Sequence, residues 1–126
     1  MPPRDTTGPG TPFSCHTHHD ESTGAVRLAL AGQLDVGTVT EVDRALDAAV
    51  ARHPSWVIVD LRGLTHMDST GLNLLLRTEA RTRKAGLRFT IVQGGAAVRR
   101  LFELTGADAY LPIVDDLAAS PTAAPE

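Results

Sequence analysis

Trp56-Val57-Ile58-Val59 is an unbroken apolar run that follows Pro54. A short run of this kind is typical of a central strand that is buried on both faces. A few residues later the chain reads LTHMDSTGL at residues 64–72, where Asp68 or Ser69 can cap a helix that begins there. A buried strand followed by a capped helix predicts a strand–helix unit of an α/β sheet.

The residues before this unit predict a hairpin and a helix. Apolar and polar residues alternate in two segments, 13–17 and 26–30, and the turn between them falls at residues 21–24. Thr38 with Glu41 three residues later predicts a capping box at the start of a helix. Behind it an apolar residue recurs at helical spacing, at Val39, Val42, Leu46, Ala49 and Val50.

The residues after the unit continue the alternation of helix and strand. An amphipathic helix carries Leu72 and Leu75 on one side and a basic face on the other, formed by Arg77, Arg81 and Lys84, with Gly86 suited to its C-terminal cap. A strand over 87–92, a helix over 97–104 ending at Gly106 and a short edge strand over 110–114 follow. The order β-β-α-β-α-β-α-β predicts a mixed sheet whose helices pack on it as crossovers, with a C-terminal helix that is short or absent.

Length and composition indicate one small domain. The chain has 126 residues and a formal net charge of −3, and it has a single cysteine and no strongly basic run. We therefore expect no direct binding to nucleic acid and no disulfide framework. Proline-rich and small residues predict a disordered tail at 1–12 and a mobile tail at 117–126, with the domain at 13–116. No apolar stretch is long enough for a signal peptide or a membrane span, so we expect a cytoplasmic protein without membrane contact.

The junction at residues 64–72 allows two readings. In the simpler one, Asp68 and Ser69 only satisfy the free backbone N–H groups of the following helix. In the other, the hydroxyl of Ser69 lies near solvent, where a kinase can reach it and where a phosphate meets the positive end of the helix dipole. Phosphorylation would add a charge of about −1.5 to −2 without unfolding the domain. Such a change is large enough to switch a protein contact on or off.

Four stretches together resemble a known family. They are GQLD at residues 32–35, VIVDL at 57–61, MDSTGL at 67–72 and VRRLFELTG at 98–106. In this order and spacing they resemble the STAS domain of bacterial anti-sigma factor antagonists, over about residues 13–116. The resemblance implies a STAS-like α/β fold and a protein that is not an enzyme and needs no cofactor.

The resemblance also implies a partner-switching cycle. The unphosphorylated antagonist binds an anti-sigma factor that is also a serine kinase, which frees a sigma factor, and phosphorylation ends this binding until a phosphoserine phosphatase reverses it. The family acceptor serine maps to Ser69, with Thr70 as the neighbouring hydroxyl. The implied partner-binding residues are Asp35, Asp68, Ser69, Thr70 and Gly71.

The chain departs from the family in two places. Its third helix opens with Gly94-Gly95-Ala96-Ala97 where a Ser-Pro start is common, and its last helix is reduced to what residues 115–119 can form. The shortened end leaves one face of the sheet less covered, which points to a partner or to a second copy of the chain in a homodimer. The rival function is that of a STAS-domain structural subunit of a transporter or other complex, without a phosphorylation cycle.

Other chemistry is less well supported by the same residues. His66, Asp68 and Ser69 lie within four positions and cannot readily converge as a hydrolytic triad. A metal site at the histidines of 16–19 lacks an evident fourth ligand, so solvated side chains are the better account, and Cys15 is expected to be a small core residue. For the basic helical face, a solvated surface is the more common explanation than an acidic partner.

Overall fold

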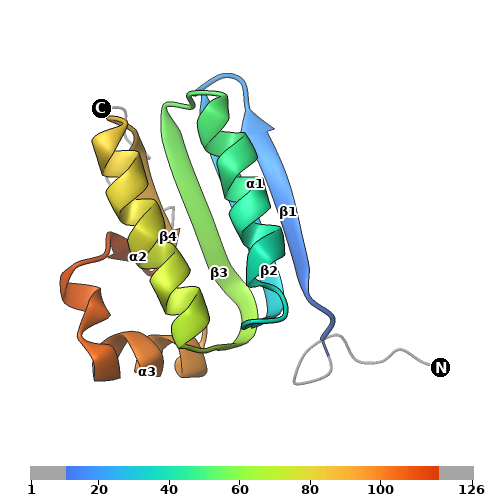
Figure 1. The fold of residues 1–126 in the computed structure, drawn as a ribbon, viewed down its shortest axis with the longest axis vertical. Helices are drawn as coiled ribbons and strands as arrows, with labels where there is room; N and C mark the ends of the chain where they lie inside the picture. Colours follow the sequence, from blue (N-terminus) through green and yellow to red (C-terminus); the bar gives the residue numbers. More distant parts are fainter. Residues whose placement is uncertain (1–10, 117–126) are drawn as a thin grey trace.

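A computed structural model describes residues 11–116, so the predicted tails lie outside it apart from Thr11 and Pro12. Its elements alternate much as the sequence predicts (Figure 1). They are β1 (Ser14–Asp20), β2 (Ala25–Leu34), α1 (Val39–Ala51), β3 (Trp56–Met67), α2 (Ser69–Lys84), β4 (Arg88–Val92), α3 (Ala96–Thr105), a 3-10 helix (Ala107–Ala109) and β5 (Ile113–Val114). In this described part no helix is both long and apolar enough to cross a bilayer.

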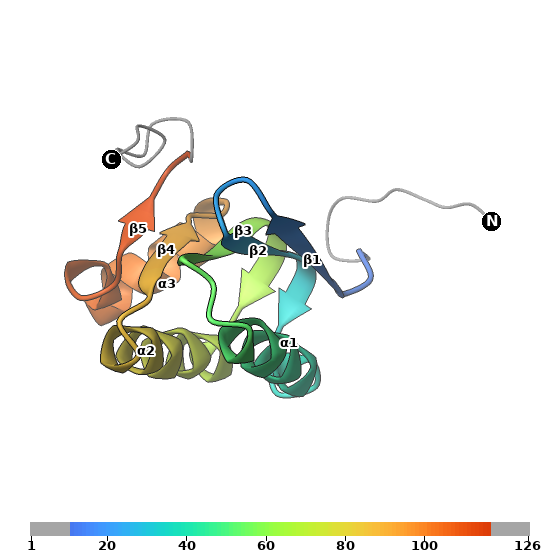
Figure 2. The same ribbon diagram turned by 90° about the horizontal axis from the view of Figure 1, so that it is seen from above.

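The sheet has five strands in the order β1-β2-β3-β4-β5. β1 and β2 pair antiparallel as a hairpin, whereas the other neighbouring strands pair parallel. The predicted mixed sheet with crossover helices is therefore confirmed. Helices α1 and α2 lie together on one face (Figure 2), and α3 lies at the end of the sheet where α2 begins (Figure 1).

The core lies between the sheet and helices α1 and α2. Val57, Val59 and Leu61 of β3 are fully buried in it, and Phe102 of α3 joins the same cluster. Removing the apolar surface of these side chains from water is the main favourable contribution to folding. The alternate residues of β3, Ile58 among them, are on the opposite side of the sheet, which we call the open face because no helix of residues 11–116 covers it (Figure 2).

Two local predictions are wrong. The Thr38 hydroxyl does not cap α1, because it donates to the carbonyl oxygen of Gln33 (2.8 Å) and accepts from the N–H of Asp35 (3.1 Å), which closes the β2–α1 loop instead. The last strand covers only Ile113–Val114, since the N–H of Tyr110 and that of Leu111 both donate to the carbonyl oxygen of Ala107 and form a turn. The glycine ends of α2 and α3 are confirmed by the positive φ of Gly86 and Gly106.

Candidate functional site

The carboxyl ends of β2 and β3 lie side by side and position the candidate site. Leu34 and Met67 are paired across these two parallel strands, and two register shifts in the pairing bring the ends level. The backbone N–H of Asp68 donates to the carbonyl oxygen of Leu34 at 3.3 Å. As a result, the loop that starts at Asp35 and the helix that starts at Ser69 form one continuous surface at this edge of the sheet.

Asp68 is the N-cap of α2. Its backbone is extended, with φ −110° and ψ −169°, and one carboxylate oxygen accepts the N–H of Thr70 at 2.9 Å. The Asp68 carbonyl also accepts the first helical hydrogen bond, from the N–H of Leu72 at 3.2 Å. The simpler reading of Asp68 is therefore correct, because its carboxylate satisfies a free N–H group of the first turn.

Ser69 is exposed at the first position of α2, as predicted for a serine at a helix start. Asp68 already caps the helix, and the Ser69 hydroxyl makes no hydrogen bond to any residue within 11–116. Thr70, the neighbouring hydroxyl, is half-buried. Of the two adjacent hydroxyls, Ser69 is the more accessible to an enzyme.

Gly71 is buried and has a packing role. A Cβ atom placed on Gly71 would lie 2.7 Å from Cγ of Met67 and 2.9 Å from Cδ2 of Leu34. Only a glycine lets the first turn of α2 lie this close to the ends of β2 and β3. The sequence grouped Gly71 with the partner-binding residues, whereas in the structure Gly71 is buried against Met67 and Leu34.

The loop between β2 and α1 is a tight turn that places an apolar side chain in solvent. The carboxylate of Asp35 accepts the N–H of Gly37 at 3.0 Å, and its carbonyl accepts the N–H of Val39 at 2.9 Å. Val36, between these contacts, is 78% exposed. Sequence reasoning did not single out Val36, because its exposure follows from the way this loop turns in the folded chain.

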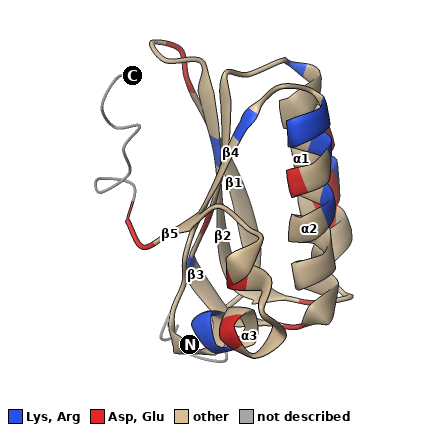
Figure 3. Cartoon of the chain, turned by 90° about the vertical axis from the view of Figure 1, so that its left-hand side faces the viewer, with Lys and Arg blue, Asp and Glu red and all other residues tan. Residues whose placement is uncertain are grey.

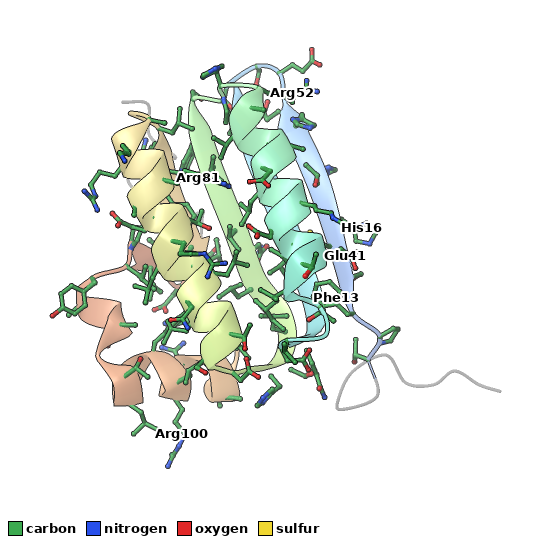
Figure 4. All side chains as sticks on the ribbon, in the orientation of Figure 1. Phe13, His16, Glu41, Arg52, Arg81 and Arg100 are labelled. Carbon is green, nitrogen blue, oxygen red and sulfur yellow. The ribbon has the colours of Figure 1, made fainter. Side chains whose placement is uncertain are left out.

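The remaining candidate residues support the less specific readings. Arg81 extends from α2 to Asp47 on α1 and forms an ion pair there (Figure 4), so part of the basic helical face is neutralised within the domain. Burial, and then the charge of Glu41, raises the pKa of the Cys15 thiol, which makes its reactive thiolate scarce. Among residues 11–116 no three side chains of His, Cys, Asp or Glu are placed to hold a metal ion.

Comparison with known proteins decides the family. Residues 17–120 match the STAS domain. The chain belongs to the STAS domain family. The resemblance to STAS-domain anti-sigma factor antagonists is also confirmed by similar proteins and by a solved structure.

The anti-sigma-F factor antagonist RsfB of Mycobacterium tuberculosis is 28% identical to this STAS protein over 85 residues, which are 68% of this chain and 69% of the relative. The anti-sigma-B factor antagonist of Staphylococcus aureus is 32% identical over 79 residues, 63% of this chain and 73% of the relative. The crystal structure of an anti-sigma factor antagonist from Mycobacterium paratuberculosis aligns with a TM-score of 0.79 at 26% identity, and covers 95% of this chain and 99% of that one. The STAS antagonist family is generally non-enzymatic.

Proposed function

We propose that this STAS protein is a phosphorylation-controlled anti-sigma factor antagonist whose switched residue is Ser69. The unphosphorylated form binds an anti-sigma factor that is also a serine kinase, and the bound kinase then no longer holds its sigma factor. Phosphate on Ser69 ends the binding, and a phosphoserine phosphatase restores it. The similarity to antagonists named for anti-sigma-F and anti-sigma-B factors supports this choice of partner.

The observation that carries the proposal is the free, exposed hydroxyl of Ser69 beside a cap made by another residue. Because the carboxylate of Asp68 holds the Thr70 N–H, a kinase can modify Ser69 without removing any hydrogen bond of the first turn. The phosphate also lies at the positive end of the α2 dipole, which favours negative charge. The phosphorylated domain should therefore keep its fold.

The surface around Ser69 suits a partner that is sensitive to added charge. The exposed side chain of Val36 offers an apolar contact, and Asp35 and Asp68 lie at the ends of the two neighbouring strands. Against this surface a docked partner meets the neutral Ser69 hydroxyl. A phosphate in its place adds about two negative charges to a surface that already holds two carboxylates, and burying it without partner cations costs several kcal/mol.

The proposal assigns each remaining predicted residue a role. Asp35, Ser69 and Thr70 contribute side chains to the docking surface, while Gly71 acts by keeping α2 close to Met67 and Leu34. Asp68 contributes both its charge and its cap. Catalysis belongs to the kinase and the phosphatase, so the purified STAS protein should hydrolyse no ATP by itself.

Phosphosite mapping tests the acceptor. The protein is incubated with its cognate anti-sigma kinase and ATP, and tandem mass spectrometry locates the phosphate. We expect one phosphate, on Ser69, and none on a Ser69→Ala variant. A Ser22→Ala variant is the matched control, because Ser22 is also exposed but lies in the β1–β2 turn at the other end of the sheet. Phosphate on Thr70 or elsewhere in the Ser69→Ala variant would contradict the assignment.

A further inference from the structure

The outer edge of β1 is a long strand edge that has no partner strand among residues 11–116. β1 comes first in the strand order, so only its inner edge is paired, with β2. It has seven residues, whereas β5 at the opposite border of the sheet has two. A typical strand has about five to six residues. An unpaired edge presents a row of free N–H and C=O groups that can pair with another strand.

β1 lacks the features that usually keep an edge strand from pairing. These features are proline, lysine, a β-bulge or an inward-pointing charge. The sequence of β1, SCHTHHD, contains no proline, lysine or arginine, and its one acidic residue, Asp20, is the last of the strand. Its pairing with β2 continues without a register shift from Ser14 to Asp20. The edge is therefore regular over its whole length.

No helix of the described residues blocks this edge. α1 packs on β1 and β2, and β1 lies beside it at the margin of the molecule (Figure 1). Figure 3 shows the sheet on edge, with α1 and α2 on one side only. A strand added beside β1 would therefore meet free backbone groups and no covering element of residues 11–116.

The side-chain pattern of β1 suits a second copy of the same strand. In an antiparallel pair, residues directly opposite each other share a face of the sheet. A pairing centred on Thr17 overlaps all seven residues, whereas a centre on His18 overlaps residues 16–20 only. The centre on Thr17 places the two Thr17 side chains together and His16 opposite His18 on the open face. Threonine pairs and aromatic pairs are both favourable across strands.

The charges on and beside β1 also fit this pairing. Asp20 would lie opposite Ser14 of the second copy, whose hydroxyl can donate to the carboxylate. The two Asp20 carboxylates then lie at opposite ends of the paired strands, about 20 Å apart. This distance exceeds the Debye length of about 8 Å at physiological salt, so their repulsion is largely screened. Arg27, which lies opposite His18 on β2, already forms an ion pair with Asp60 at 3.2 Å.

The N-terminal segment of the same chain is a poorer match for the edge. Residues 1–12 contain four prolines. A proline lacks the N–H that a strand donates to its neighbour, so a proline-rich segment does not form a regular ladder. β1 of a second copy, in contrast, carries a backbone N–H at every position.

We propose that β1 pairs antiparallel with β1 of a second copy, with the two Thr17 residues at the two-fold axis. The pairing joins two five-stranded sheets into one continuous sheet. α2 packs on β3 and β4, away from this edge, so Ser69 stays accessible in both copies. This inference does not depend on the proposed phosphorylation.

Sedimentation velocity of the full chain at neutral pH, over a range of concentrations, tests the pairing. The chain has a mass of 13.4 kDa, and we expect a species of twice this mass to increase with concentration. Thr17→Lys should abolish that species, because it places two like charges directly opposite each other. Thr17 is exposed, so the variant should keep its fold, which circular dichroism checks.

Ala80→Lys is the matched control for the charge. Ala80 is exposed on α2, so the variant adds the same charge away from β1 and should dimerise as wild type does. A single-chain mass for wild type at every concentration would overturn the proposal. Equal behaviour of the Thr17→Lys and Ala80→Lys variants would overturn it as well.

Disulfide trapping tests the register. A Thr17→Cys variant in a Cys15→Ser background brings two thiols directly opposite each other. Opposite residues of an antiparallel pair have Cα atoms about 4.5 to 5.5 Å apart, which suits a disulfide. Mild oxidation should convert most of this variant into a covalent dimer, whereas Ala80→Cys in the same background should stay a single chain. No covalent dimer of the Thr17→Cys variant, or equal yields from the two variants, would contradict a pairing centred on Thr17.

Discussion

The N–H of Asp68 donates to the carbonyl oxygen of Leu34 across 3.3 Å and so joins the start of α2 to the end of β2. Asp35 follows Leu34 and Ser69 follows Asp68, which makes the β2–α1 loop and the first turn of α2 one surface. A partner that docks there meets the apolar Val36 and the Ser69 hydroxyl together. Changes on either element should therefore alter the same binding equilibrium.

Val36→Asp should weaken binding to the anti-sigma factor without affecting the fold. An apolar side chain that is 78% exposed contributes little to stability, but at the centre of an interface its loss costs about 1.4 kcal/mol or more, or tenfold in affinity. Isothermal titration calorimetry measures the affinity, and the melting temperature checks the fold. Leu104→Asp, on α3, is the matched control. Should both variants bind as wild type does, Val36 is not part of the docking surface.

Replacing Asp68 separates its cap from its charge. Asp68→Ala should lower the free energy of unfolding by about 1 kcal/mol, because the Thr70 N–H loses its acceptor. Asp68→Asn keeps an acceptor oxygen and should stay within a few tenths of a kcal/mol of wild type. Urea denaturation measures both. An equal loss in the two variants would show that the charge, and not the cap, is what stabilises the helix.

Gly71→Ala should destabilise the domain by about 1 to 3 kcal/mol, since the new methyl group overlaps Met67 and Leu34 in a well-packed region. Gly95→Ala is the control, because a Cβ there meets nothing within 4 Å. Thermal unfolding compares the two. If Gly71→Ala were as stable as Gly95→Ala, the close approach of α2 to the strand ends would not be required.

Asp60 should make the free energy of unfolding depend on pH in the acidic range. Its burial alone would raise its pKa, but the hydrogen bonds and charge of Arg62 and the charge of Arg27 outweigh this and hold the pKa below its usual value. A lowered folded-state pKa stabilises the protein above the unfolded pKa, and this contribution is lost as the pH falls through the folded value. Asp60→Asn should therefore cost about 1 to 3 kcal/mol at pH 7.

The pH series supplies the control for this variant. The difference in unfolding free energy between wild type and Asp60→Asn should shrink as the pH falls below about 4, because the carboxylate takes up its proton there in the unfolded chain and only at lower pH in the folded protein. A difference that is constant from pH 7 to pH 3 would mean that the ion pairs with Arg27 and Arg62 contribute nothing.

The sequence predicted the strand and helix order because hydrophobic periodicity reports local structure. It placed the hairpin, the three helices and the glycine ends of α2 and α3, since Gly86 and Gly106 need a positive φ that few other residues adopt. It could not predict that Asp60 is buried on β3, because the arginine that pairs with it from β2 is 33 residues away in the chain. The apolar run alone gave no sign that β3 continues through Asp60 to Met67.

At the candidate site the sequence identified Asp68 and Ser69, but it did not show which of the two caps α2. Either residue can cap a helix, and only the backbone geometry assigns the cap to Asp68. The prediction that the Thr38 hydroxyl caps α1 is wrong. The hydroxyl bonds to the backbone of Gln33 and Asp35 instead, and these contacts depend on the tight loop, which the local sequence pattern does not reveal. Val36 was missed because exposure depends on how that loop turns.

In the proposed switch, the charge on Ser69 decides whether the anti-sigma factor stays bound. The most direct test of this switch is calorimetric titration of the anti-sigma factor with the unphosphorylated protein and with protein carrying one phosphate on Ser69. The account predicts binding at least about tenfold weaker for the phosphorylated form, and full recovery after phosphatase treatment. Equal affinity of the two forms, with the fold of both intact, would contradict it.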